Sequence, residues 1–260
     1  MNRLTPTMNA FLGGWLAALV ATCSARDASG AEPHHAVRQL SGSWSGTVVV
    51  ENRPVAVNLT ISEGARGAGG AEFHYGVPRS CGLNAEYSGE GDDKQYFSFT
   101  TSTGGFCDGL IGGYVAARLA SEGTLAFDAA SSDAQTSTSG TLRRSGEDGL
   151  SDEITGNWRG QVMAGGRPIA LNVSVRKGSI GDELIELHFG APRSCRLSAE
   201  YEGVWQGQAA FGMKSATGGF CDSLTTGLMV MSAASGGTLS FNITTPDGAP
   251  SATGTLHKAR

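Results

Sequence analysis

The sequence is poor in charged residues and has no excess of positive charge. Only 17% of its 260 residues are Asp, Glu, Lys or Arg, and the formal net charge is −5. A protein that binds nucleic acid through the phosphate backbone needs a basic face, so this composition gives no support to a nucleic-acid partner. The sequence also lacks a run of the roughly 20 apolar residues that a membrane-spanning helix requires. We therefore expect no transmembrane segment.

The longest apolar run is short and lies near the start of the chain. Arg3 is the only charged residue before the run "AFLGGWLAALVA" at residues 10–21. A single positive charge, a short apolar run and small residues after it are typical of an export signal. The pattern predicts a signal peptide over residues 1–31, with cleavage after Ala25 or Ala31. We therefore expect a periplasmic or secreted protein of a bacterial envelope.

Cysteine is scarce, with five residues in the chain. Cys23 lies within the predicted signal peptide, at the end of "VATC", a loose match to a lipoprotein signal. It is either removed with the signal or serves as a lipid anchor. Four cysteines remain, namely Cys81, Cys107, Cys195 and Cys221. In an exported chain they are expected to form disulfides, and four cysteines allow three pairings.

The chain contains two copies of one unit. Residues 41–144 align without a gap with residues 155–258, at an offset of 114, and about 40 of the 104 aligned positions are identical. "HYGVPRSC" ends at Cys81 and "HFGAPRSC" ends at Cys195, and "TGGFCD" occurs in both copies. With the signal peptide over residues 1–31, the alignment predicts a flexible leader over 32–40, a first repeat over 41–144, a linker over 145–154 and a second repeat over 155–260.

The duplication decides between the disulfide pairings. Each copy holds two cysteines that are 26 residues apart, and a unit that was once single would pair its own two. We therefore predict the disulfides Cys81–Cys107 and Cys195–Cys221. The rival interpretation, a zinc site, needs all four cysteines together or histidine ligands nearby. We expect no metal and no cofactor.

Each copy is predicted to be all-β. Apolar and small or polar residues alternate over residues 55–62 and again over 169–176, and a period of two indicates a strand with one buried face. The 39 glycines of the chain suit the turns of such a fold. Further runs in the first copy lie near residues 44–50, 71–76, 81–88, 95–100, 110–118, 123–128 and 138–143. About eight short strands predict an antiparallel barrel or a sandwich in each copy.

One short motif resembles a known family. Gly42 and Trp44, and again Gly156 and Trp158, form a Gly-x-Trp motif at the first strand of each copy. This is similar to the calycins, the group of lipocalin and avidin barrels. The resemblance implies a small up-and-down barrel whose open end can hold a ligand. It implies no catalytic residues.

The repeated phrases predict a corner made of two loops. Each disulfide brings the Pro-Arg-Ser-Cys turn close to the Gly-Gly-Phe-Cys-Asp loop, because bridged Cα atoms lie about 5.5 Å apart. The candidate binding residues of the first copy are Arg79, Gly104, Gly105, Phe106 and Asp108, and those of the second are Arg193, Gly218, Gly219, Phe220 and Asp222. The alternative is structural: an Arg–Asp ion pair holds the two loops together, and the phenylalanine packs into the core.

Catalysis finds little support in the sequence. Glu72 and His74, repeated as Glu186 and His188, are expected to share an outer strand face, where a solvated pair is the simplest interpretation. We therefore predict a non-catalytic binding protein that recognises a protein or a glycan through its two corners, for example as an inhibitor or immunity protein. One alternative is a carrier that holds a small apolar ligand inside the barrel. The other is an envelope hydrolase that uses carboxylates such as Glu86.

Overall fold

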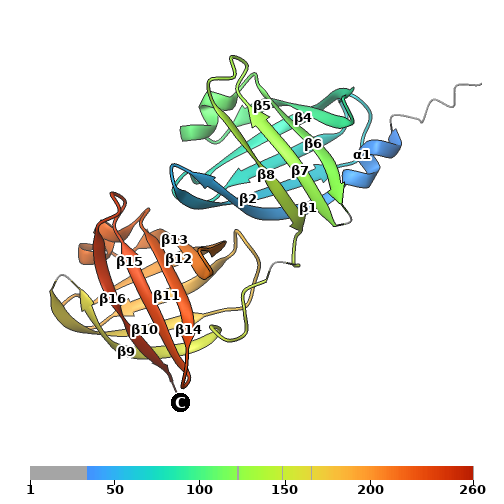
Figure 1. Ribbon diagram of the computed structural model, residues 1–260. Coiled ribbons are helices and arrows are strands. Elements are labelled where there is room, and N and C mark those ends of the chain that lie inside the picture. Colours follow the sequence, from blue (N-terminus) through green and yellow to red (C-terminus); the bar gives the residue numbers. More distant parts are fainter. Residues whose placement is uncertain (1–33, 122, 148, 165, 260) are drawn as a thin grey trace, which may run out of the picture. The chain divides into compact units, whose positions relative to one another are not determined.

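A computed structural model describes residues 34–121, 123–147, 149–164 and 166–259. The predicted signal peptide over residues 1–31, with the candidate lipid anchor Cys23, lies outside these residues. Within the described part of the chain, no helix is both long and apolar enough to cross a membrane. Each copy of the repeat forms a closed, antiparallel, eight-stranded barrel (Figure 1).

The first barrel, called barrel 1 below, runs up and down in chain order. Its strands are β1 (Gly42–Val50), β2 (Arg53–Ser62), β3 (Gly70–Tyr75), β4 (Cys81–Gly91), β5 (Lys94–Ser102), β6 (Tyr114–Ser121), β7 (Thr124–Ala130) and β8 (Ser137–Arg144). Each strand pairs with the next, and β8 returns to β1 through the pairs Trp44 with Arg144 and Ser45 with Arg143. Successive connections therefore alternate between the two ends of the barrel.

The second barrel, called barrel 2 below, repeats this topology. Its strands are β9 (Gly156–Ala164), β10 (Arg167–Val175), β11 (Glu183–Phe189), β12 (Cys195–Trp205), β13 (Gln208–Ala216), β14 (Leu228–Ala234), β15 (Thr238–Thr244) and β16 (Pro250–Lys258). It closes between β16 and β9, where Lys258 pairs with Trp158. The all-β prediction is confirmed, and of the two architectures left open by the sequence, the chain adopts the barrel.

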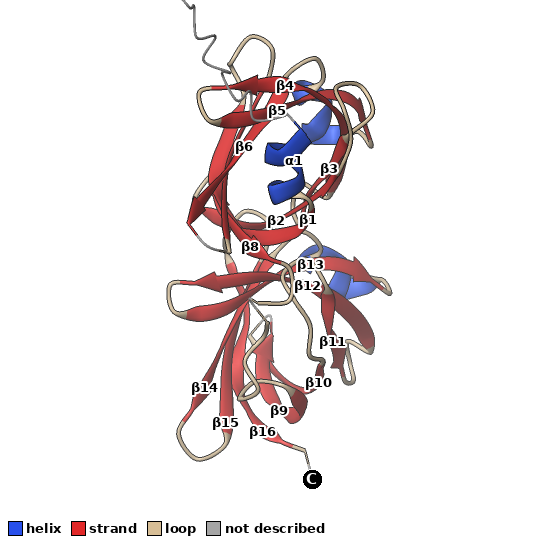
Figure 2. Cartoon of the chain, turned by 90° about the vertical axis from the view of Figure 1, so that its right-hand side faces the viewer, coloured by secondary structure: helices blue, strands red, loops and turns tan. Residues whose placement is uncertain are grey.

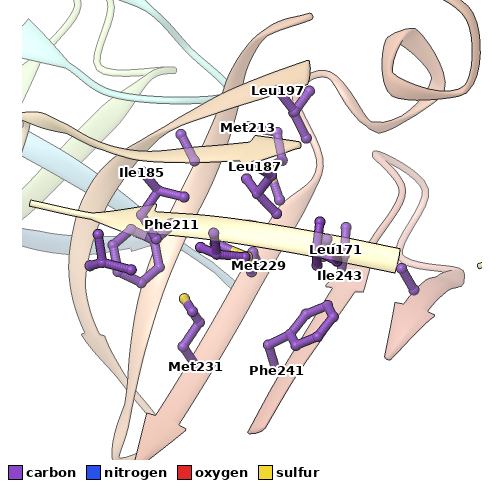
Figure 3. Packing of buried hydrophobic residues seen from close by; sticks show 14 of the residues in the cluster. Leu171, Ile185, Leu187, Leu197, Phe211, Met213, Met229, Met231, Phe241 and Ile243 are labelled. Atoms are coloured by element: carbon purple, nitrogen blue, oxygen red, sulfur yellow. The ribbon is translucent and has the colours of Figure 1, made fainter. Parts of the chain in front are cut away.

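The alternating residues fill the barrels. In β2, Val55, Val57, Leu59 and Ile61 are all buried in the core of barrel 1. The equivalent side chains of β10 are buried in barrel 2, where methionines and aliphatic residues surround Phe211 and Phe241 (Figure 3). A side chain at every second position points to the same face, so the period of two in the sequence becomes one continuous core.

Aromatic rings occupy the interior of barrel 1. The ring of Phe73 lies 4.9 Å from that of Tyr75, 5.3 Å from Phe127 and 6.3 Å from Phe99, measured between ring centroids. These separations are those of aromatic rings packed in direct contact. The centre of this barrel is therefore filled by the protein's own side chains.

The predicted flexible leader is wrong for residues 34–40, which form the helix α1 (His34–Leu40). Val37 and Leu40 of this helix are buried in the core of barrel 1, and Trp44 donates its indole N–H to the carbonyl oxygen of Leu40 at 2.8 Å. Figure 2 shows α1 lying across the ring of strands. Burial of two apolar side chains stabilises a helix that is too short to be stable alone.

Barrel 2 has a counterpart of this arrangement in the predicted linker. Leu150 and Ile154 are buried in its core, and Trp158 donates its indole N–H to the carbonyl oxygen of Ile154 at 2.8 Å. The tryptophan of each Gly-x-Trp motif therefore anchors the segment that precedes its own barrel.

Candidate functional site

The candidate site in each barrel consists of two loops joined by a disulfide. In barrel 1 these are the β3–β4 turn (76–80) and the β5–β6 loop (103–113), and in barrel 2 they are residues 190–194 and 217–227. The disulfides Cys81–Cys107 and Cys195–Cys221 are formed as predicted, each with a Cα–Cα distance of 6.0 Å. We call each pair of loops a corner.

The Pro-Arg-Ser-Cys turn has the same backbone in both copies. The amide of Ser80 donates to the carbonyl oxygen of Gly76 at 2.8 Å, and the amide of Ser194 donates to that of Gly190 at 3.0 Å. Both X–Pro peptide bonds in the two turns are cis. The turn therefore presents the arginine of each copy in a similar backbone setting, two residues before the bridged cysteine.

The Gly-Gly-Phe loop is shaped by its glycines. Gly104 and Gly105 have φ values of 105° and 65°, and Gly218 and Gly219 have 104° and 65°. Side chains other than glycine rarely adopt these values. The chain then enters a short 3₁₀-helix, η1 (Gly105–Leu110) or η2 (Gly219–Leu224). The predicted strand near residues 110–118 therefore begins only at Tyr114.

Across the disulfide, each arginine lies over the phenylalanine of the other loop. The guanidinium carbon of Arg79 is 4.3 Å from the ring centroid of Phe106, and that of Arg193 is 4.6 Å from that of Phe220. This is the geometry of a cation–π contact. Each ring also makes a T-shaped contact with a core aromatic, Tyr75 at 5.2 Å from Phe106 and Phe189 at 5.3 Å from Phe220 between ring centroids.

The aspartates do not pair with the arginines. Asp108 accepts a hydrogen bond from the Ser102 hydroxyl, and Arg79 forms its ion pair with Glu51, at 3.1 Å. Asp222 is exposed. In the described part of the chain neither corner contains an Arg–Asp ion pair, so the contact between the loops is made by the arginine–phenylalanine stack and the disulfide.

Glu51 is a residue of the site that the sequence did not identify. It lies in the β1–β2 turn, at the same end of barrel 1 as the corner. The other residues of the corner occur in both copies, whereas the position equivalent to Glu51 in the second copy is Gly165. The repeat pattern therefore carries no signal for Glu51.

The Glu-x-His pairs are on the outer face, as predicted. Glu72, His74, Glu186 and His188 are all exposed on β3 and β11. Among the described residues, no group of three or more His, Cys, Asp or Glu side chains is placed to hold a metal ion.

Tyr75 links the core of barrel 1 to its corner. Burial raises the pKa of its phenol to about 12, and the charge of Arg79 opposes this shift. The folded barrel therefore keeps the proton to a higher pH than the unfolded chain does. Stability is fully present below about pH 10 and falls as the pH rises towards about 12.

We expect Tyr75→Phe to abolish this loss, which is about 2 kcal/mol on the linkage relation. Barrel 2 already carries Phe189 at the equivalent position, so the substitution should leave the fold intact. Rapid ultraviolet titration of tyrosinate should show that a component titrating near pH 12 is lost. Tyr114→Phe, on an exposed side chain, is the matched control and should retain that component. An unchanged titration in Tyr75→Phe would refute the assignment.

Comparison of the chain with protein-family models, with curated proteins and with solved structures finds no match. The two eight-stranded barrels agree with the architecture that the Gly-x-Trp resemblance implies. Membership of the calycins receives no support from these comparisons.

Proposed function

We propose that this protein is an exported, non-catalytic binding protein that recognises a protein or a glycan through its two corners. The observation that carries the proposal is the arginine stacked on a phenylalanine across a disulfide, which both barrels present in the same geometry. Arginine and aromatic side chains are the residues most often found at the energetic centres of interfaces.

The setting of the corners favours recognition. Loops held by a rigid β scaffold are common binding sites, and a rigid loop loses little conformational entropy when it binds. Two similar corners in one chain can also raise the overall affinity, because the second contact is made within one molecule.

The alternatives have less support. A carrier of a small apolar ligand needs free interior space, and rings in mutual contact occupy the interior of barrel 1. A hydrolase would need two carboxylates acting on one substrate, and Glu86 lies exposed on the strand β4. Export is inferred from the signal-like segment and agrees with the two disulfides, which persist in oxidising compartments.

A photo-crosslinking amino acid at the corner tests the proposal. Ser223 is exposed in the corner of barrel 2, and Ser235 is exposed in the β14–β15 turn at the opposite end of the same barrel. With the mature protein in its host envelope, we expect a discrete crosslinked partner from position 223 and none from position 235.

The arginines provide the specificity control. Arg79→Ala combined with Arg193→Ala should reduce that crosslink at least about tenfold, as loss of interface hot spots does, while the thermal midpoint changes by only a few degrees. Crosslinks that survive the double substitution, or that form equally at both ends of the barrel, would show that the corner does not recognise the partner.

A further inference from the structure

The two corners differ in the group that lies beside the N–H edge of the arginine guanidinium. In barrel 1 the Arg79 guanidinium has its face on Phe106 and one of its edge nitrogens 3.1 Å from the Glu51 carboxylate. Glu51 lies at the tip of the β1–β2 turn, and its side chain is 82% exposed apart from this contact. The guanidinium of Arg79 is therefore already paired with a carboxylate of the same chain.

In barrel 2 the same arginine has no such carboxylate. The sequence places Gly165 at the position equivalent to Glu51, and glycine has no side chain to offer. Arg193 keeps its stack on Phe220 and is exposed. Within the described ranges, no Asp or Glu forms an ion pair with it, and the exposed side chain leaves the guanidinium accessible to a partner.

We propose, on the basis of the proposed function, that Arg193 is a carboxylate-recognition site that takes an Asp or Glu side chain of a protein partner. The stack on Phe220 fixes the plane of the guanidinium, which directs its edge N–H groups outward. A planar guanidinium matches a carboxylate with two parallel hydrogen bonds. Glu51 in barrel 1 shows which group, presented from a turn, fits against this edge.

The same geometry favours a protein over a sugar. Sugars commonly bind by stacking on a free aromatic face, and the Phe220 ring has Arg193 over one face and a T-shaped contact with the buried Phe189. The polar edge of Arg193 is what the corner offers. The two corners therefore differ at the arginine: in barrel 1 a partner's carboxylate would have to displace the exposed Glu51 from Arg79, whereas in barrel 2 the carboxylate can bind Arg193 directly.

The test uses the full mature chain, labelled for observation of arginine Nε–Hε signals by NMR at low ionic strength. The probe is N-acetylglutamate methylamide, and its glutamine analogue is the neutral control. We expect a saturable shift of the Arg193 signal with the glutamate probe, with a Kd on the order of 10 mM, and none with the glutamine probe. The Arg79 signal should not respond.

Substitutions at the position that differs make the test reciprocal. Gly165→Glu should weaken the Arg193 response at least about tenfold, because the new carboxylate competes for the same edge, whereas Gly165→Gln should not. Glu51→Gly should give Arg79 a response of its own. Equal effects of Gly165→Glu and Gly165→Gln, or no Arg193 response to the probe, would overturn the proposal.

The outcome can be separated from that of the proposed function. Glucuronate is the third probe. If the Arg193 signal shifts with glucuronate and not with the glutamate probe, the partner is an acidic glycan, and this proposal is overturned. If Arg193 binds the glutamate probe while position 223 yields no crosslink, the carboxylate site stands and the proposed function fails. If the crosslink forms and Gly165→Glu does not reduce it, the reverse holds.

Discussion

Replacement of both Cys195 and Cys221 by alanine is expected to lower the free energy of unfolding of barrel 2 by about 3.5 kcal/mol. The two cysteines are 26 residues apart, and a cross-link that closes a loop of that length removes conformational entropy from the unfolded chain, which raises its free energy by about this much on the entropy model. Both cysteines are also buried in the core. Because small domains are marginally stable, the loss is a large fraction of the stability of the barrel.

Hydrogen exchange measured by mass spectrometry as a function of denaturant can follow each barrel separately. Peptides of barrel 2 should lose protection at lower denaturant concentration in the Cys195→Ala, Cys221→Ala variant, and peptides of barrel 1 should keep theirs. The matched variant, Cys81→Ala with Cys107→Ala, should show the opposite pattern. A change below about 1 kcal/mol in both variants would mean that the strands alone hold the loops.

The same variant also separates positioning from stability. Arg193 and Phe220 lie on the two loops that the bridge joins. Without the bridge the stack must be held by the loops alone, so the crosslink from position 223 should weaken under conditions where barrel 2 is still folded. A full crosslink in a folded, disulfide-free barrel would show that the bridge contributes stability and not geometry.

Much of the fold could be predicted because the sequence contains two copies of the same domain. The period-two alternation in residues 55–62 and 169–176 indicates a strand from local sequence alone. Because the two copies align without a gap, each predicted strand must occur at the same position in both, which restricts the number of strands. The disulfide pairing followed from the same duplication. These features depend on side-chain polarity and position, which the sequence records directly.

The parts that could not be predicted depend on single tertiary contacts. The helix α1 and the buried Leu150 and Ile154 lie in polar segments without periodicity, and the contact with the barrel core alone orders them. The corner shows the same limit. A disulfide fixes where two backbones meet and leaves the direction of the neighbouring side chains open. The sequence therefore could not distinguish an Arg79–Asp108 ion pair from the contacts that form, which are the stack of Arg79 on Phe106 and its ion pair with Glu51.

Gly113→Ala is expected to destabilise barrel 1 by more than about 3 kcal/mol, because the added methyl group has no room. A Cβ at this position would lie 2.0 Å from the carbonyl oxygen of Ala130, and that oxygen belongs to the backbone of β7. Gly113 also accepts a hydrogen bond from the amide of Phe99 at 3.0 Å and donates one to Leu110 at 3.0 Å. The glycine therefore bonds the corner loop to β5 and lies directly against the backbone of β7.

The control for this substitution lies four residues earlier in the same loop. A Cβ at Gly109 would meet nothing within 4 Å, and the second copy already carries Ser223 there, so Gly109→Ala should change the stability by less than about 0.5 kcal/mol. Gly227→Ala in barrel 2, whose Cβ would lie 2.2 Å from the carbonyl oxygen of Thr244, should reproduce the large effect. Denaturant melts of the three variants measure these differences. The clash is with backbone atoms in both barrels, so it can be relieved only if the backbone moves. Similar stabilities for Gly113→Ala and Gly109→Ala would therefore mean that the strands can separate at this point. The corner would then lack the rigid support that the proposed recognition requires.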